Sequence, residues 1–231
     1  MKVDLINAII DDYYQALVAG RTPVAVDILD DNYLSFNEQW KAASDDFGAM
    51  YDTTLTSKVS QRYWVDKGYF PKEAIQAFIA DDHDFIKSIF ISLLDESKEV
   101  DGRVSRFIMS LDALLASHNK GEQKLPLHYH EDRRMVLFYL TMTSPDKYFY
   151  VTYSQLSIML RAVKSAAPLH TLDIERIGKF SKVLDVFINK HEKLIAYIKD
   201  YSSKNGIKYD GLSFWKSDMM EYAVVNLGKG I

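Results

Sequence analysis

Apolar residues recur every three or four positions along most of this chain, which is the spacing of one face of an α-helix. The stripe nearest the N-terminus consists of Val3, Ile6, Ile10, Tyr13 and Leu17. Gly20 follows this stripe and is typical of a helix C-terminus. Similar stripes cover residues 85–94 and 104–115, and another helix is predicted to begin at Pro71, because a missing N–H costs nothing in a first turn. The pattern predicts a mostly α-helical, multi-helix fold with at most a minor β element.

The longest stripe predicts a helix from Thr171 to about Ser202, with Thr171 and Asp173 as candidate N-terminal caps. About 28 residues beyond the candidate caps, at 1.5 Å each, would span roughly 42 Å, the width of a small domain. Such a helix either forms the spine of the fold or breaks near Lys190 and His191.

The candidate β element is the aromatic run from Tyr148 to Tyr153. Tyrosine, phenylalanine, valine and threonine favour a half-buried strand, in which Tyr148 and Tyr150 would share one face. The same run could instead be an extended linker into the next helix. Tyrosines exposed beside Lys147 could stack on flipped or single-stranded bases, whereas the alternative is tyrosines packed with hydrogen-bonded hydroxyls.

The polar segment 117–126 is the clearest break between periodic stretches. We therefore expect an acidic N-terminal helical part, residues 1–120, and a basic C-terminal helical part, residues 127–231, packed as one domain. Residues 1–100 carry 9 Lys and Arg against 18 Asp and Glu, whereas residues 101–231 carry 19 against 14. A phosphate-binding surface needs local positive potential, so the second half is the better place to seek one.

The composition indicates an ordinary globular protein. The chain has 231 residues, of which 48% are hydrophobic and 26% charged, and its formal net charge is −4. It has no cysteine, which excludes disulfides, thiolate catalysis and thiolate zinc sites. Its apolar runs are shorter than the roughly 20 residues of a membrane span, and the acidic N-terminal segment does not resemble a secretory signal. A cytoplasmic protein without membrane contact is the expectation.

The common motifs of several enzyme classes are absent from the sequence. It contains no GxxxxGK[ST], GxSxG, GxGxxG or HExxH pattern. These absences disfavour an NTPase, a common serine hydrolase, a dinucleotide enzyme and a zincin. We therefore expect a non-enzymatic chain with no cofactor.

Two histidines in the segment 128–132 form the one metal-like grouping. His128 and His130 could converge on an ion if the backbone is extended, with Glu131 or Asp132 completing the shell. The favoured alternative is a polar helix N-terminus, in which the two acids complement the helix dipole and the histidines bind no metal.

Adjacent arginines follow this grouping, at Arg133 and Arg134. On a helix they would point about 100° apart, so at most one faces inward, where it would pair with a carboxylate such as Asp132, Asp112 or Asp146. The other could bind a phosphate, because a planar guanidinium suits phosphate oxygens.

The block 131–160 resembles a segment in the N-terminal regions of bacterial McrB-like AAA+ proteins. In both, an acidic-arginine cluster opens a helix, and a turn with proline, an acid, a base and tyrosine leads through an aromatic run into the next helix. The likeness covers roughly residues 36–160. Its upstream positions are Trp40, Asp45, Asp46, Phe47, Met50, Tyr69, Phe70, Pro71, Lys72, Ile75, Phe78, Ile89, Phe90, residues 93–97, Arg103, Arg106 and Phe107. The chain departs from the pattern in having Val151 where a lysine is usual, and in the shifted order of residues 131–134.

The resemblance implies a region ahead of an AAA+ GTPase motor in a modification-dependent restriction system. The motor would lie beyond Ile231, and a nuclease subunit would be a further partner. Such a region recognises the target, typically DNA, for which Tyr148, Tyr150 and Tyr153 could supply an aromatic pocket. The leading hypothesis is DNA binding, with Arg133, Arg134 and Lys147 on phosphates and Tyr148 and Tyr150 on a base. The alternative is a protein-interaction or scaffold module of a defence system that does not contact nucleic acid.

Overall fold

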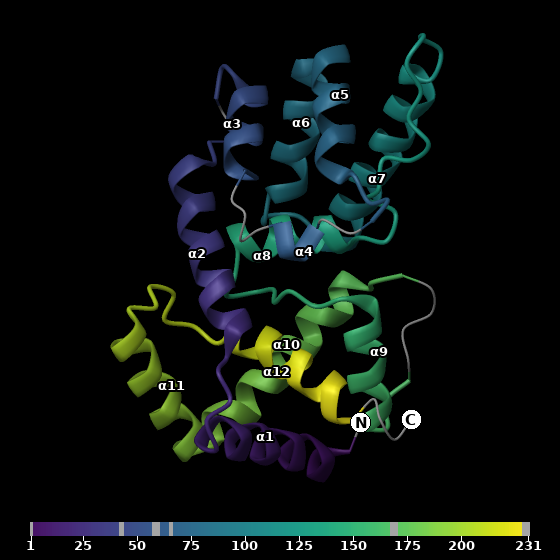
Figure 1. The fold of residues 1–231 in the computed structure, drawn as a ribbon. Helices are drawn as coiled ribbons and strands as arrows, with labels where there is room; N and C mark the ends of the chain where they lie inside the picture. The colour runs from purple at the N-terminus through teal and green to yellow at the C-terminus, as the bar shows by residue number, and fades with distance from the viewer. Residues whose placement is uncertain (1, 42–43, 57–60, 65–66, 167–170, 228–231) are drawn as a thin grey trace. The chain divides into compact units, whose positions relative to one another are not determined.

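A computed structural model describes residues 2–41, 44–56, 61–64, 67–166 and 171–227, and the regular elements within these ranges are helices (Figure 1). The helices are α1 Val3–Val18, α2 Val24–Gln39, α3 Phe47–Thr54, α4 Gln61–Trp64, α5 Pro71–Asp81, α6 His83–Leu94, α7 Val100–His118, α8 Arg134–Thr143, α9 Tyr153–Ala162, α10 Ile174–Lys190, α11 Glu192–Asn205 and α12 Ser213–Leu227. The predicted mostly α-helical fold is confirmed. The aromatic run before α9 is an extended linker, which was one of the two alternatives for it.

The chain divides into two compact units. Unit 1 comprises Met1–Asp31 and Ser144–Ile231, and unit 2 comprises Asn32–Thr143. These units cut across the predicted parts 1–120 and 127–231, because the N-terminal helix packs with the C-terminal helices. Unit 2 carries 13 Lys and Arg against 17 Asp and Glu, whereas unit 1 carries 15 of each. The acidic excess of the chain therefore belongs to unit 2.

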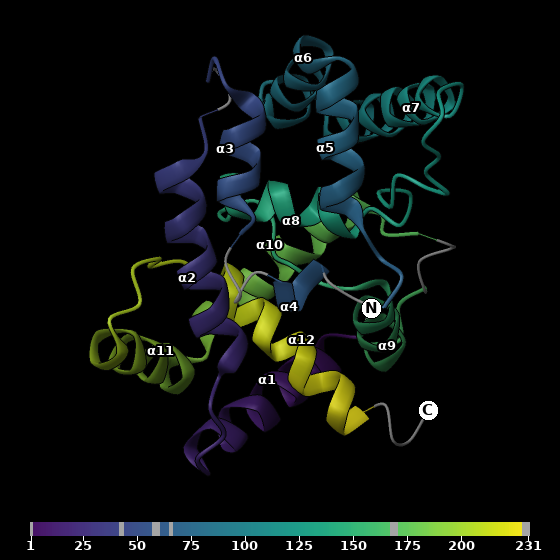
Figure 2. The same cartoon turned by 45° about the horizontal axis from the view of Figure 1, so that its top comes forward.

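Unit 1 is built around α12. This helix packs against α1, α9 and α10, and Figure 2 shows it crossing α1. All eight side chains from Ser213 to Met220 are buried, although Lys216 and Asp218 among them are charged. Such burial requires partners for both charges, and α1, α10 and the α1–α2 loop supply them.

The long C-terminal helical stretch breaks at His191, as one of the two sequence-based alternatives proposed. His191 ends α10 and caps α11, because its Nδ1 accepts the N–H of Leu194 at 3.0 Å. Its Nε2 lies 2.7 Å from Oδ1 of Asp11 in α1. The predicted cap Asp173 is also confirmed, since its carboxylate accepts the N–H of Arg176 at 2.9 Å.

Unit 2 has an aromatic core. Helices α5 and α6 lie side by side in both views, and α7 packs against both (Figures 1 and 2). The ring at the centre is Phe90 of α6, which contacts Trp40, Phe47, Tyr51, Phe107 and Tyr139. Helix α8 is buried from Met135 to Met142.

None of the helices in the described ranges is both long enough and apolar enough to cross a membrane.

Candidate functional site

The segment before α8 has an unusual backbone. Tyr129 and Arg133 adopt positive φ angles of 64° and 62°, in the left-handed region that disfavours residues other than glycine. The sequence pattern placed the start of this helix within residues 128–132. The backbone conformation explains why α8 begins only at Arg134. Two such residues within one short segment indicate a conformation that the surrounding structure imposes.

Two buried histidines, His128 and His130, hold this segment in place through hydrogen bonds. The N–H of His130 donates to Nδ1 of His128 at 3.2 Å, so the proton of a neutral His128 ring lies on Nε2, 3.1 Å from Oδ1 of Asp112 in α7. Nδ1 of His130 donates to the carbonyl oxygen of His128 at 2.6 Å. The conformation of the segment is therefore fixed by the histidines on either side of Tyr129.

The second histidine continues a hydrogen-bond chain into the core. Nε2 of His130 accepts from the hydroxyl of Tyr139 at 3.2 Å, and that hydroxyl shares a bond of 2.8 Å with the hydroxyl of Tyr51. Burial lowers the pKa of His130 to about 3, and burial raises the pKa of both tyrosines. All three groups are thus neutral at pH 7.

The hydrogen bonds occupy all four ring nitrogens of the two histidines. The two histidines are therefore buried and hydrogen-bonded within the fold, whereas the sequence favoured loop histidines beside a polar helix N-terminus. Within the described ranges, no group of three or more His, Asp or Glu side chains is placed to hold a metal ion.

Tyr129, between the two histidines, packs in a small aromatic cluster. Its ring packs edge-on against Tyr69 at 5.7 Å and Phe70 at 6.0 Å between centroids. The guanidinium of Arg134 lies 4.0 Å above the ring of Tyr69. Phe70 is 48% exposed, so the cluster reaches the surface. We name Tyr69, Phe70, Tyr129 and Arg134 the Tyr129 cluster.

Of the two arginines predicted as contacts, Arg134 pairs with Asp132. Asp132 accepts its backbone N–H at 2.9 Å, and the second carboxylate oxygen lies 3.5 Å from its Nε. The sequence had named Asp132 among the expected partners of an inward arginine. Arg133 is half-buried and immediately precedes α8. Both arginines belong to unit 2.

The other three predicted contact residues belong to unit 1. Lys147 is exposed, but Tyr148 and Tyr150 are only 5% and 4% exposed, and Phe149 and Val151 between and after them are buried as well. Of the two alternatives for these tyrosines, the structure has the packed one, because both faces of the linker are buried. The carbonyl oxygen of Tyr148, for example, accepts a hydrogen bond from the hydroxyl of Ser213 in α12 at 2.7 Å. Base stacking on either ring would require it to leave the core.

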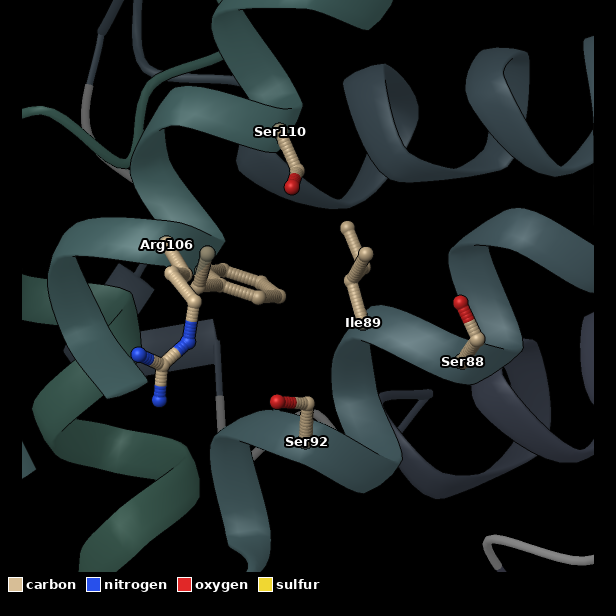
Figure 3. Close-up of a pocket in the computed structure, with 6 residues that line it drawn as sticks. Ser88, Ile89, Ser92, Arg106 and Ser110 are labelled. Atoms are coloured by element: carbon tan, nitrogen blue, oxygen red, sulfur yellow. The ribbon is translucent and has the colours of Figure 1, made fainter. Parts of the chain in front are cut away.

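Sequence reasoning missed a pocket between α6 and α7. It has a volume of about 200 Å³ and is lined by Ser88, Ile89, Ser92, Arg106, Phe107 and Ser110 (Figure 3). We name it the α6–α7 pocket. The available signal was a pair of polar residues one helical turn apart on each helix, and this signal becomes meaningful only once the two helices are known to face each other.

Comparisons with protein-family models, with curated proteins and with solved structures gave no match to this chain.

Proposed function

We propose that this chain is a non-enzymatic recognition module whose unit 2 binds a protein partner through the Tyr129 cluster. The observation that carries the proposal is the left-handed backbone of Tyr129, fixed between two buried histidines. A non-glycine residue in this conformation costs about 1–3 kcal/mol, and such strain is concentrated at sites where the protein holds a side chain ready for use.

A rigid aromatic group is well suited to recognition. Tyrosine and arginine are enriched among the residues that dominate binding energies at interfaces. Tyr129 is confined by Tyr69 and Phe70, so little conformational entropy remains to be lost when a partner binds. Leu127, two residues before Tyr129, is also exposed.

The charges around the cluster favour a basic protein partner over DNA. The side chains of Asp112, Glu131 and Asp132 are 61%, 42% and 49% exposed. This charge would repel a phosphate backbone but attract lysine or arginine. The partner surface is therefore expected to carry an apolar side chain beside a basic one.

The McrB-like resemblance suggests where such a partner surface would be found, namely on the AAA+ motor or the nuclease subunit. DNA recognition is the second candidate function. It is supported by the basic excess of residues 101–231 and by the exposed side chain of Lys147.

A peptide-display selection tests the proposal. The wild-type chain is the target, and a Phe70→Ala/Tyr129→Ala variant is used for counter-selection. We expect enriched peptides that combine a large apolar residue with lysine or arginine. A synthetic version of an enriched peptide should bind the wild type at least about tenfold more tightly than it binds the double variant. This is the size of effect that a dominant interface residue produces.

Met109→Ala is the matched control, since Met109 is 69% exposed in unit 2 and lies outside the cluster. In parallel, methylated and unmethylated duplex and single-stranded DNA are tested across a salt series from about 50 mM, because phosphate contacts weaken steeply with salt. Failure to enrich any peptide, combined with salt-sensitive DNA binding that Arg134→Ala weakens, would replace the protein-binding proposal with the DNA-binding one.

A further inference from the structure

The α6–α7 pocket has polar walls and an apolar floor. Ser88 and Ser92 lie one turn apart on α6, and Arg106 and Ser110 lie one turn apart on α7. The buried side chains of Ile89 and Phe107 form the floor. In Figure 3 the hydroxyls of Ser92 and Ser110 are directed into the space between the helices, and Arg106 flanks it.

Three of these side chains retain hydrogen-bond donors. Across the ranges that the structure describes, Ser92, Ser110 and Arg106 form no side-chain hydrogen bond or ion pair with the protein. Ser88 differs, because its hydroxyl donates to the carbonyl oxygen of Phe85 at 2.7 Å. A guanidinium alone offers five N–H groups. The pocket is therefore rich in donors.

Another arginine on α7, Arg103, has a structural role and serves as a comparison. Arg103 is buried, donates to the carbonyl oxygen of Leu93 at 2.5 Å and pairs with Glu96 at 2.8 Å. Arg106, about one turn later, is exposed beside the pocket. Its guanidinium lies along the helix over Gly102, where a Cβ would be 3.4 Å from Nη1. The missing side chain at position 102 leaves room for the guanidinium beside the pocket.

We propose that the α6–α7 pocket binds a small phosphate ester. A tetrahedral phosphate has several acceptor oxygens, which can bind the planar guanidinium of Arg106 and the hydroxyls of Ser92 and Ser110 together. A carboxylate offers fewer acceptors for the same three donor groups. The apolar floor accommodates a short hydrocarbon or ring attached to the phosphate.

The size of the pocket limits the ligand. Its volume of about 200 Å³ lies below the roughly 300–1,000 Å³ of sites for drug-sized molecules. A nucleotide therefore exceeds the pocket, whereas a phosphate with a small apolar substituent fits. The pocket is formed by α6 and α7, and it shares no residue with the Tyr129 cluster. The phosphate-binding proposal and the protein-binding proposal can therefore fail separately.

An NMR titration of the full chain tests this site. The probes are inorganic phosphate and phenyl phosphate, with chloride at matched ionic strength as the reference. We expect amide shifts concentrated at residues 88–92 and 106–110. Phosphate should bind with a Kd of about 1 mM, and phenyl phosphate about threefold or more tightly because its ring covers Ile89 and Phe107.

Variants separate recognition from general electrostatic attraction. Arg106→Ala should weaken phenyl phosphate binding about tenfold, and Arg106→Lys should retain part of the affinity because it keeps the charge but loses the planar fork. Lys120→Ala removes an exposed charge from the region just after α7 and should leave affinity unchanged. A Ser92→Ala/Ser110→Ala variant provides a second test that preserves the charge, and it should weaken binding severalfold.

Two results would overturn the proposal. One is the absence of localised shifts with either probe at about 20 mM, well above the expected Kd. The other is equal affinity in the wild type, in Arg106→Ala and in the double serine variant.

Discussion

Both units bury polar side chains, but the network around α12 in unit 1 joins charged groups, whereas the network beside Tyr129 in unit 2 joins histidine and tyrosine rings; the buried Arg103 of unit 2 lies outside that network. In unit 1, Asp218 accepts hydrogen bonds from the hydroxyl of Tyr13 at 2.7 Å, from the guanidinium of Arg21 and from the N–H of Ala25 at 3.1 Å. Lys216, two residues before Asp218, donates to Ser181 at 2.6 Å and Asp185 at 2.8 Å. Burial lowers the pKa of Lys216, while its pairing with Asp185 opposes that shift.

In unit 2 the equivalent network runs through His128, His130, Tyr139 and Tyr51, and burial keeps the last three uncharged. The comparison shows that stability depends on the charge partners in the unit 1 network and on pH in the unit 2 network. A buried charge depends on each of its partners, since losing one leaves it uncompensated. A buried neutral histidine depends instead on pH, because protons bind it more readily once the chain unfolds.

The largest effect is expected from breaking the unit 1 network. Asp218→Ala leaves Arg21 and the hydroxyl of Tyr13 without their acceptor and should reduce the free energy of unfolding by about 3–5 kcal/mol. Chemical denaturation measures this change. Asp210→Ala, which removes an exposed carboxylate from the same unit, should shift it by less than about 0.5 kcal/mol. Equal effects in the two variants would contradict the role given to the buried network.

The next effect is a pH dependence in unit 2. The pKa of His130 is about 3 in the folded protein against 6.5 for an unperturbed histidine. The unfolded chain therefore binds the extra proton below pH 6.5, and the stability present above that pH is lost progressively towards pH 3. The loss is about 1.4 kcal/mol per pH unit, or about 2 kcal/mol at pH 5.

Replacing the ring isolates this contribution. His130→Phe should lower stability at pH 8, because the segment loses two hydrogen bonds, but it should remove this part of the decline between pH 6.5 and 5. Chemical denaturation at several pH values measures the unfolding free energy of both proteins, and the difference between them gives the contribution of His130. The same decline in both proteins would show that His130 does not cause it.

The smallest effect concerns backbone strain in the same segment. Tyr129→Ala and Tyr129→Gly both remove the ring, but alanine must still adopt φ of 64°, which glycine does without steric cost. Tyr129→Gly should therefore be more stable than Tyr129→Ala by about 1 kcal/mol. Thermal or chemical denaturation of the two variants measures the difference. If alanine were the more stable substitution, position 129 would not be strained.

The sequence was most informative where local signals determine structure. The apolar stripes predicted the helices, Asp173 was identified as a cap, and Gly20, which follows α1, has the positive φ of 100° that its residue type suggested. A break near His191 was one of the two alternatives for the longest stripe. These features depend on residues close to one another in the chain.

Features that depend on distant residues were harder to predict. The burial of Tyr148 and Tyr150 arises because α12, more than 60 residues later, packs on the linker, as the hydrogen bond between Ser213 and Tyr148 shows. The left-handed Tyr129 is imposed by histidines whose partners lie in α7 and α8. The α6–α7 pocket requires the pairing of two helices, which neither stripe specifies by itself.

The binding of a selected basic peptide to the wild type and to Tyr129→Gly tests the central claim most directly. Glycine removes the ring while easing the backbone strain, so a loss of affinity cannot be attributed to unfolding. We predict at least about tenfold weaker binding by the variant in fluorescence anisotropy, with Met109→Ala unchanged. Equal affinity of the wild type and Tyr129→Gly would contradict the assignment of the Tyr129 cluster as the recognition surface.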